Sequence, residues 1–301
     1  MRLITQTDFD LNKATAENKT IINSYLDKYL ELRYPHKIWE SIRYSVLSDG
    51  KRIRPVLMLE SGRVCGGKIE DIIPTACALE MLHAQSLIHD DLPCMDDDDY
   101  RRGKPTNHKV YGEATAVLAG DALLSYAPQV IINHTPESVN RKILLKVLEE
   151  FLKAAGPMGI VGGQVVDIDS ENKEIDLATF NYILSHKTGE LFKFAIRAGA
   201  LLSDASDEML EALSFYGKTI GYAFQIADDI LDVTGSLKTL GKTPGKDLNA
   251  GKNTHVSLYG MDESKKELET LCINAQQALL EKDIKSPILM GIAENIAAKA
   301  L

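Results

Sequence analysis

The chain has 301 residues, and 45% of them are apolar, which is enough to build a substantial core. Its formal net charge is −9, from 34 basic and 43 acidic residues. This acidic balance argues against a general nucleic-acid binder. A basic cluster that lines a site would therefore be a local feature of an acidic protein, selective for its own ligand.

Targeting and redox signals point to a cytoplasmic protein. The four cysteines have no CxxC spacing, so we expect reduced thiols and neither a zinc site nor a redox pair. The start of the chain has no apolar region typical of a secretory signal. No uncharged apolar run reaches about 18 residues, so we expect no membrane span.

Helical periodicity runs through almost the whole chain, and strand-like alternation is absent. The sequence predicts helices near 12–33, 37–48, 53–65, 72–91, 114–134, 138–154, 177–199, 206–233, 262–282 and 286–300. We therefore expect one all-α domain over residues 1–301, a helical bundle with its site between helices. The longest irregular segment, 235–253, carries four lysines and is predicted to be a lid over an anionic ligand.

The first acidic cluster, Asp90-Asp91 and Asp96, follows an apolar helical stretch. Carboxylates at the C-terminal end of a helix interact unfavourably with its dipole unless a cation offsets them. Six residues do not share one helical face, so the segment after Pro93 must loop back for Asp96 to join the others. The run continues as Asp97–Asp99, which we interpret as mostly solvated.

The second cluster, Asp228-Asp229 and Asp232, lies within an apolar stretch. Asp228 and Asp232 are four residues apart, so on a helix they share a face, and Asp229 projects roughly 100° away. Grouped carboxylates repel one another unless a cation lies between them. Because oxygen ligands with little nitrogen or sulphur suit Mg²⁺, the two clusters predict a magnesium site that grips a diphosphate.

Basic and polar side chains accompany these clusters, and together they suggest two anion sites, one bridged by metal and one free of it. Neutral oxygens near a metal–diphosphate site can stabilise a developing cation through their dipoles. His83 lies on the predicted helix of Asp90, seven residues before it, and Gln225 precedes Asp228 by three. The other candidates are Lys51, Arg54, Arg101, Arg102, Lys187, Thr188, Lys242 and Lys252.

Several segments together resemble the trans-isoprenyl diphosphate synthases, the family of farnesyl and geranylgeranyl diphosphate synthases. The resemblance rests on GKRIRP (50–55), the long segment 80–124 with its DDLPCMD motif, GGQVVD (162–167), HKTG (186–189), FQIADDILD (224–232), LGKTPGKD (240–247) and GKNT (251–254). It implies a helical bundle around a deep central cavity, a homodimer and three Mg²⁺ ions when a diphosphate is bound.

The resemblance also implies a role for each matched residue. The main metal contacts would be Asp90, Asp96 and Asp228, supported by Asp91, Asp229 and Asp232. Isopentenyl diphosphate would be held by Lys51, Arg54, His83 and Arg102, and the allylic diphosphate by Arg101, Lys187, Lys242 and Lys252. Thr188 and Gln225 would face the allylic carbocation, so the catalytic set is Asp90, Lys187, Thr188, Gln225 and Asp228.

The implied reaction is the head-to-tail condensation of isopentenyl diphosphate with an allylic diphosphate, dimethylallyl or geranyl. An aromatic floor four or five residues before Asp90 would limit the product to fifteen carbons, but Gln85 and Ser86 stand there. We expect farnesyl diphosphate, with geranylgeranyl diphosphate as the alternative. A terpene cyclase or a non-catalytic synthase subunit is disfavoured because both acidic motifs are intact.

Overall fold

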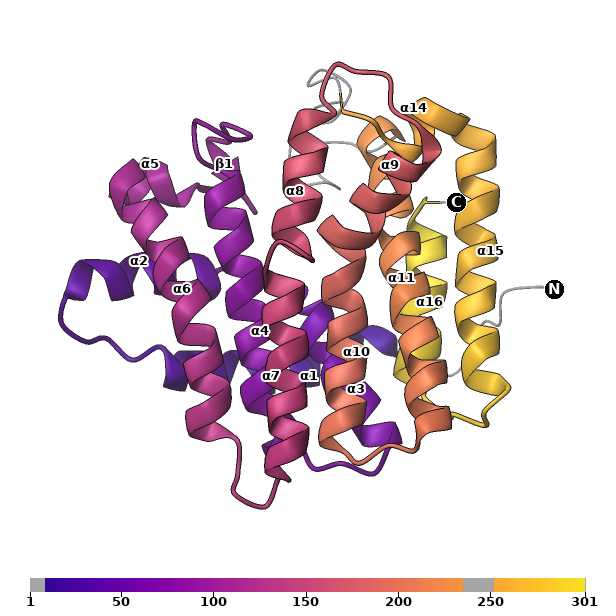
Figure 1. The fold of residues 1–301 in the computed structure, drawn as a ribbon, viewed down its shortest axis with the longest axis horizontal. Helices are drawn as coiled ribbons and strands as arrows, with labels where there is room; N and C mark the ends of the chain where they lie inside the picture. The colour runs from indigo at the N-terminus through magenta and orange to yellow at the C-terminus, as the bar shows by residue number, and fades with distance from the viewer. Residues whose placement is uncertain (1–8, 235–251, 301) are drawn as a thin grey trace.

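The computed structural model describes residues 9–234 and 252–300, and helices dominate this part of the chain (Figure 1). In chain order the elements are α1 (Leu11–Tyr29), α2 (His36–Val46), α3 (Ile53–Val64), α4 (Ile69–Asp90), β1 (Tyr100–Arg101), β2 (Lys104–Pro105), α5 (Asn107–Tyr111), α6 (Glu113–His134), α7 (Arg141–Ala155), α8 (Ile160–Asp169), α9 (Leu177–Ile183), the π-helix η1 (Leu184–Gly189), α10 (Glu190–Leu202), α11 (Asp207–Thr234), α14 (His255–Tyr259), α15 (Met261–Leu280) and α16 (Pro287–Ala300). The expected all-α bundle is confirmed.

The centre of the bundle is formed by α3, α4, α10 and α11, which pack side by side. Helix α4 is buried almost continuously from Ile72 to Leu82, and α10 is buried on most of its surface. A helix with apolar side chains all round has no solvent face and belongs in the middle of a bundle. The outer helices α6, α7, α15 and α16 cover this centre, and their buried residues join one continuous core.

Glycines allow the central helices to approach closely. A Cβ atom built on Gly199 of α10 would lie 2.1 Å from the carbonyl oxygen of Met58 in α3. The contact is with backbone, which cannot move aside as a flexible side chain can. The crossing of α3 and α10 therefore depends on glycine at this position.

The structure differs from the expected elements in three places. Helix α8 was not predicted, and the predicted helix 177–199 is divided into α9, η1 and α10. A two-stranded antiparallel hairpin, β1–β2, occurs where no strand was expected. Its turn is made by Arg102 at φ 54° and Gly103 at φ 76°, the positive angles that a tight hairpin turn requires.

Helix α6 is long and apolar enough, by length and composition alone, to cross a membrane. One side of it packs in the core through residues such as Ala119, Leu123 and Ala127. The other side exposes Leu118 and Ile132. The core helix of a water-soluble bundle passes the same test, so the finding is weak support for a span.

Candidate active site

The largest concentration of predicted site residues surrounds a cavity of about 360 Å³. Its wall is built from the end of α4 and the loop after it, from α8, from the α9–η1 segment, from α11, and from residues 252–254. The predicted residues in this wall are Asp90, Asp96, Arg101, Lys187, Thr188, Gln225, Asp228, Asp229 and Lys252. Segments far apart in the sequence therefore converge on one site.

The first acidic cluster is shaped by the loop that follows α4. The backbone N–H of Asp96 donates to the carbonyl of Asp90 at 2.8 Å, and that of Asp98 donates to the carbonyl of Asp91 at 3.2 Å. These bonds turn the chain back on itself, as the spacing of the motif requires. Asp90 and Asp96 consequently reach the same cavity, with Asp98 beside them.

The second cluster presents Asp228 and Asp229 to the cavity. Asp229 is almost fully buried and is fixed by two donors: the Gln225 side-chain amide at 2.9 Å and the backbone N–H of His255 at 2.8 Å. Asp232, one turn further along α11, is buried and is not among the residues that line the cavity. Its role as a metal ligand stays a prediction.

The carboxylates of the wall fit a hard divalent cation. Burial raises the pKa of Asp90, and nearby Asp96 adds to this, while Lys187 acts in the opposite direction. Asp91, which does not line this cavity, behaves similarly: burial raises its pKa to about 6, against the effect of Arg101. The charged forms are thus disfavoured without a cation. Because the described lining offers carboxylate oxygens and no histidine or cysteine, the donor set suits Mg²⁺.

Three cations of the cavity are each held by a carboxylate. Arg101 donates to Asp91 at 2.6 Å, and Lys252 donates to Asp96 at 3.1 Å. Lys187 pairs with Asp167 of α8. A diphosphate that entered the cavity would compete for these cations and hold them as charge-assisted donors. Lys242, and most of the predicted lid, lie outside the described residues.

A second basic group lies next to this cavity. Arg54 is 3.5 Å from His83, Nη1 to Nε2, and its guanidinium lies 4.6 Å from the ring centre of Phe192. The buried Nε of Arg54 has no hydrogen-bond partner among the described residues, and such an orphaned donor suits an anionic ligand. Burial lowers the pKa of His83 well below its usual value, with neighbouring Arg54 adding to the effect, so the ring is neutral.

The other two predicted residues of the second group, Lys51 and Arg102, line two different pockets. Lys51 lines a separate cavity of about 310 Å³, and Asp228 belongs to the walls of both cavities. Arg102 donates to the hydroxyl of Ser48 at 3.2 Å. Burial lowers its pKa, and neighbouring Arg52 adds to the effect. Lys51 and Arg102 therefore do not share one of these cavities, and the joint role of the four residues in a second anion site stays a prediction.

The predicted polar pair Thr188 and Gln225 is joined by a hydrogen bond. The Thr188 hydroxyl donates to Oε1 of Gln225 at 2.8 Å, and the Gln225 amide donates to Asp229. Thr188 lies in η1, and short π-helical segments within helices are frequent at functional sites. The chain of bonds fixes both oxygens at the cavity wall.

The proposed chain-length residues lie on α4 below Asp90. Gln85 is buried, with its amide 3.1 Å from Nδ1 of His89, and the Ser86 hydroxyl donates to the carbonyl of His83 at 3.0 Å. Neither residue lines the cavity described above, whereas the neighbouring Leu87 does. Their effect on product length stays a prediction.

Sequence reasoning assigned no role to some residues of the wall. Asp167 is the clearest case, because it pairs with Lys187 and lines the cavity. It closes the GGQVVD segment, so the segment was noticed but its carboxylate was not. Glu171 was missed because an isolated acidic residue carries no distinctive spacing. Asp98 was expected to be solvated with the rest of its acidic run, but it lines the cavity.

Comparison with known proteins places these observations in a family. Residues 35–287 match the family model described as polyprenyl synthetase. A geranylgeranyl diphosphate synthase of Cyanophora paradoxa is 46% identical over 292 residues, which covers 97% of this chain and 97% of that protein. A farnesyl diphosphate synthase of Bacillus subtilis is 42% identical over 292 residues, covering 96% of this chain and 99% of that protein.

Solved structures that resemble this chain carry names from the same group of enzymes as the sequence relatives. An FPP/GFPP synthase from Zymomonas mobilis superposes with a TM-score of 0.83 at 32% identity, covering 95% of this chain and 98% of that chain. A geranylgeranyl pyrophosphate synthetase from Pyrococcus horikoshii gives a TM-score of 0.84 at 28% identity, covering 96% and 97%. The chain is a short-chain trans-prenyltransferase and belongs to the polyprenyl synthetase family.

Proposed function

We propose that this prenyltransferase condenses isopentenyl diphosphate with dimethylallyl and then geranyl diphosphate and releases farnesyl diphosphate. The observation that carries the proposal is the shared cavity of Asp90, Asp96 and Asp228 with Arg101, Lys187 and Lys252. Opposite charges on one cavity wall suit a ligand that carries both metal and diphosphate. The presence of farnesyl diphosphate synthases among the relatives, such as that of Bacillus subtilis, supports the fifteen-carbon product.

In this proposal, Asp90, Asp96 and Asp228 would hold Mg²⁺, with Asp91, Asp229 and Asp232 in support. Mg²⁺ held there would supply positive charge to offset the negative charge that develops on the diphosphate when the allylic C–O bond breaks. Arg101, Lys187 and Lys252 orient the same diphosphate from the wall of the cavity. Their positive charge reinforces this stabilisation without any proton transfer.

The remaining wall residues suit the carbocation that bond cleavage leaves. Leu87, Phe180, Ile183 and Leu184 provide apolar lining that keeps water from quenching it. The oxygens of Thr188 and Gln225, fixed by their mutual hydrogen bond, direct their dipoles at the cation. Isopentenyl diphosphate, held by the second basic group, presents its double bond for attack on the cation. The condensed cation then loses a proton to the departing diphosphate, which forms the new double bond.

A direct assay tests the proposed product. Purified protein is incubated with Mg²⁺, isopentenyl diphosphate and dimethylallyl diphosphate, and the dephosphorylated products are separated by chain length. We expect fifteen-carbon farnesol to dominate. A dominant product of twenty carbons or longer would refute farnesyl diphosphate in favour of geranylgeranyl diphosphate, the product named for the Cyanophora relative. Small Ser86 is the feature that favours this second candidate.

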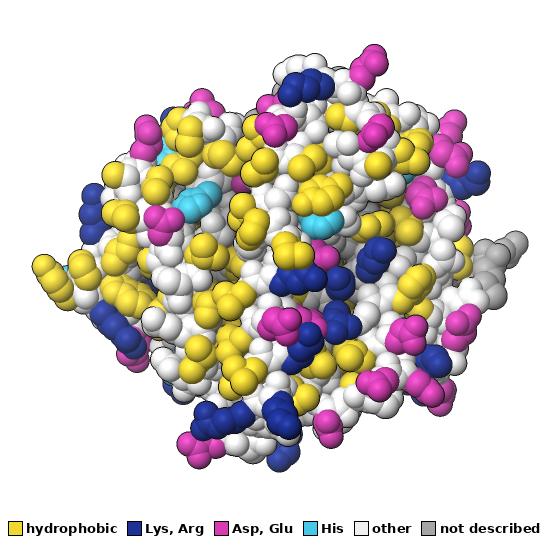
Figure 2. Space-filling model, viewed as in Figure 1, with side chains coloured by type: hydrophobic (Ala, Val, Ile, Leu, Met, Phe, Trp, Pro, Cys, Tyr) yellow, Lys and Arg dark blue, Asp and Glu magenta, His cyan; other side chains and the backbone are white. Residues whose placement is uncertain are grey.

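We further propose that two copies of the chain associate through the apolar surface of α6 and α7. Hydrophobic side chains are dense on the left of the face in Figure 2, over α6 and its neighbours. Leu118, Ile132 and Leu145 are each more than half exposed, at 59%, 56% and 66%. Contiguous exposed apolar surface marks interaction sites. Sedimentation equilibrium should give twice the chain mass of 33.2 kDa, and a mass of one chain would contradict the dimer.

A further inference from the structure

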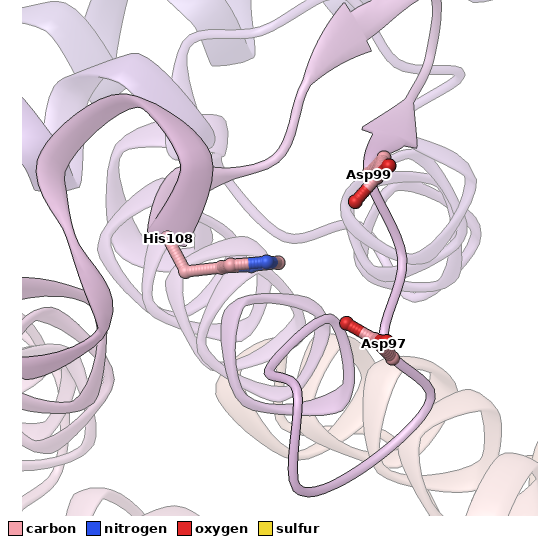
Figure 3. Close-up of side chains that lie close together, drawn as sticks. All are labelled: Asp97, Asp99 and His108. Atoms are coloured by element: carbon pink, nitrogen blue, oxygen red, sulfur yellow. The ribbon is translucent and has the colours of Figure 1, made fainter.

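The acidic run after the first cluster divides between two sites. Asp96 and Asp98 line the active-site cavity, whereas Asp97 and Asp99 point toward His108 at the start of α5 (Figure 3). One potential ligand atom from each of Asp97, Asp99 and His108 lies within 4.8 Å of the other two. Asp97 and Asp99 are exposed, as the sequence predicts, and the fold brings both of them close to a buried imidazole.

The hydrogen bond of Thr106 fixes the tautomer of His108. The Thr106 hydroxyl lies 2.6 Å from the carbonyl oxygen of Asp98 and 3.2 Å from Nδ1 of His108. A hydroxyl has one proton, and a carbonyl can only accept, so that proton goes to Asp98. Thr106 therefore accepts a hydrogen bond from Nδ1–H, which leaves the lone pair of a neutral His108 ring on Nε2.

The Nε2 atom of His108 is buried and has no partner among the described residues. His108 as a whole is only 6% exposed. Buried nitrogen atoms of this kind are nearly always satisfied by a hydrogen bond, a water or an ion. The exposed Lys109 pairs with Oδ1 of Asp99 at 2.6 Å, so it offsets part of the charge of Asp99 and does not reach the imidazole nitrogen.

We propose that Asp97, Asp99 and His108 form a second divalent-metal site, distinct from the active-site cavity and selective for Zn²⁺ over Mg²⁺. One imidazole nitrogen with two carboxylate oxygens is a donor set that zinc accepts, and Mg²⁺ prefers oxygen alone. Three protein ligands leave a fourth, tetrahedral position for water. The neutral ring with its proton held on Nδ1 by Thr106 is the form in which histidine binds zinc.

Binding the ion requires the ligand atoms to come closer together. Zinc ligands lie about 2.0–2.2 Å from the metal, so two ligand atoms of a tetrahedral site are roughly 3.4 Å apart. The present atoms lie within 4.8 Å of one another, so each pair closes by at most about 1.4 Å. Both aspartates are exposed and lie on the loop between α4 and β1, so their side chains can move inward while the buried ring stays fixed.

A bound ion would fasten the acidic loop to α5. Asp97 and Asp99 alternate with Asp96 and Asp98, and Arg101 comes two residues after Asp99. Asp96, Asp98 and Arg101 line the active-site cavity. Zinc at His108 would therefore hold the backbone that carries them in one conformation. The role is structural, since the three ligands are not part of the cavity wall.

Zinc binding to the metal-free full-length protein tests the site, with Asp97→Asn/Asp99→Asn as the diagnostic variant. Both side chains are exposed, so the variant should fold normally, as its melting curve without metal will show. Asp283→Asn is the matched control, because Asp283 is an exposed aspartate that also pairs with a lysine, Lys285. We expect the double variant to bind one Zn²⁺ fewer than the wild type, and the control to match the wild type.

Crystals soaked in Zn²⁺ locate the ion independently. Data collected above and below the zinc absorption edge should give an anomalous peak about 2.1 Å from Nε2 of His108. A zinc peak only at the cavity aspartates, or wild-type stoichiometry in the double variant, would overturn the proposal. Because Mg²⁺ and diphosphate are absent, the result does not depend on the prenyltransferase reaction.

Discussion

Replacing Asp228 with asparagine should lower kcat by about three orders of magnitude. Asparagine keeps the size of the side chain but removes its charge, and Asp228 lies in the walls of both cavities. Metal-assisted stabilisation of a leaving group contributes several kcal/mol, and about 4 kcal/mol corresponds to a factor of about 10³. Steady-state turnover of geranyl and isopentenyl diphosphates at saturating Mg²⁺ measures the effect.

Asp90→Asn should cause a loss of similar size, because Asp90 lies across the same cavity at the end of α4. The control is Asp207→Asn, which removes an exposed carboxylate from the first turn of α11, the helix that also carries Asp228. Circular dichroism should show wild-type helicity for all three variants. Turnover within tenfold of wild type in Asp228→Asn would remove the second acidic cluster from the catalytic machinery.

The fold was predictable where a helix buries an apolar stripe, and α4 and α11 lie close to their expected ranges. Helix α8 was missed because IVGGQVVDID contains two glycines, which disfavour an isolated helix. Packing outweighs that local preference. A Cβ on Gly163 would lie 2.3 Å from the backbone nitrogen of Lys187, so glycine lets α8 approach η1. This contact brings Asp167 to Lys187, a pairing that only the tertiary structure reveals.

The carboxylates of the candidate site could be predicted from the sequence, but the side chains that contact its basic residues could not. Spacing identifies Asp90, Asp96 and Asp228, because acids grouped in apolar surroundings repel one another unless a cation joins them. The contacts of Arg54 could not be predicted in this way, because His83 and Phe192 come from α4 and α10 and no local sequence pattern joins them. The π-helical turn at Thr188 was likewise hidden, because its sequence fits an ordinary helix.

The buried ion pair between Arg52 and Glu80 gives the largest expected effect on stability. Glu80→Gln should lower the free energy of unfolding by about 3–5 kcal/mol, because it leaves the arginine charge buried without its partner. The side chains are only 1% and 3% exposed, and Nη1 of Arg52 lies 2.6 Å from Oε1 of Glu80. Urea unfolding at one fixed protein concentration, followed by circular dichroism, measures the loss.

A double-mutant cycle separates the ion pair from the other contacts of Arg52. Arg52 also donates to the carbonyls of Val46 and Ser48, so Arg52→Met removes more than one interaction. Each single variant leaves one buried charge without its partner, whereas the double variant Arg52→Met/Glu80→Gln leaves none. The loss of unfolding free energy in the double variant should therefore be smaller than the sum of the losses in the two single variants, by about 2–3 kcal/mol. The control is the pair Lys266 and Glu263, exposed at 73% and 56%.

The control cycle should give a coupling below about 1 kcal/mol, since solvent screens exposed pairs. Equal coupling in the two cycles would mean that burial adds nothing to the Arg52–Glu80 interaction. Arg52 stands between Lys51 and Arg54 in the GKRIRP segment, and it adopts a left-handed backbone conformation at φ 51°. That conformation is unfavourable for a residue with a Cβ, so the ion pair is the interaction that we expect to hold both flanking cations at the second anion site.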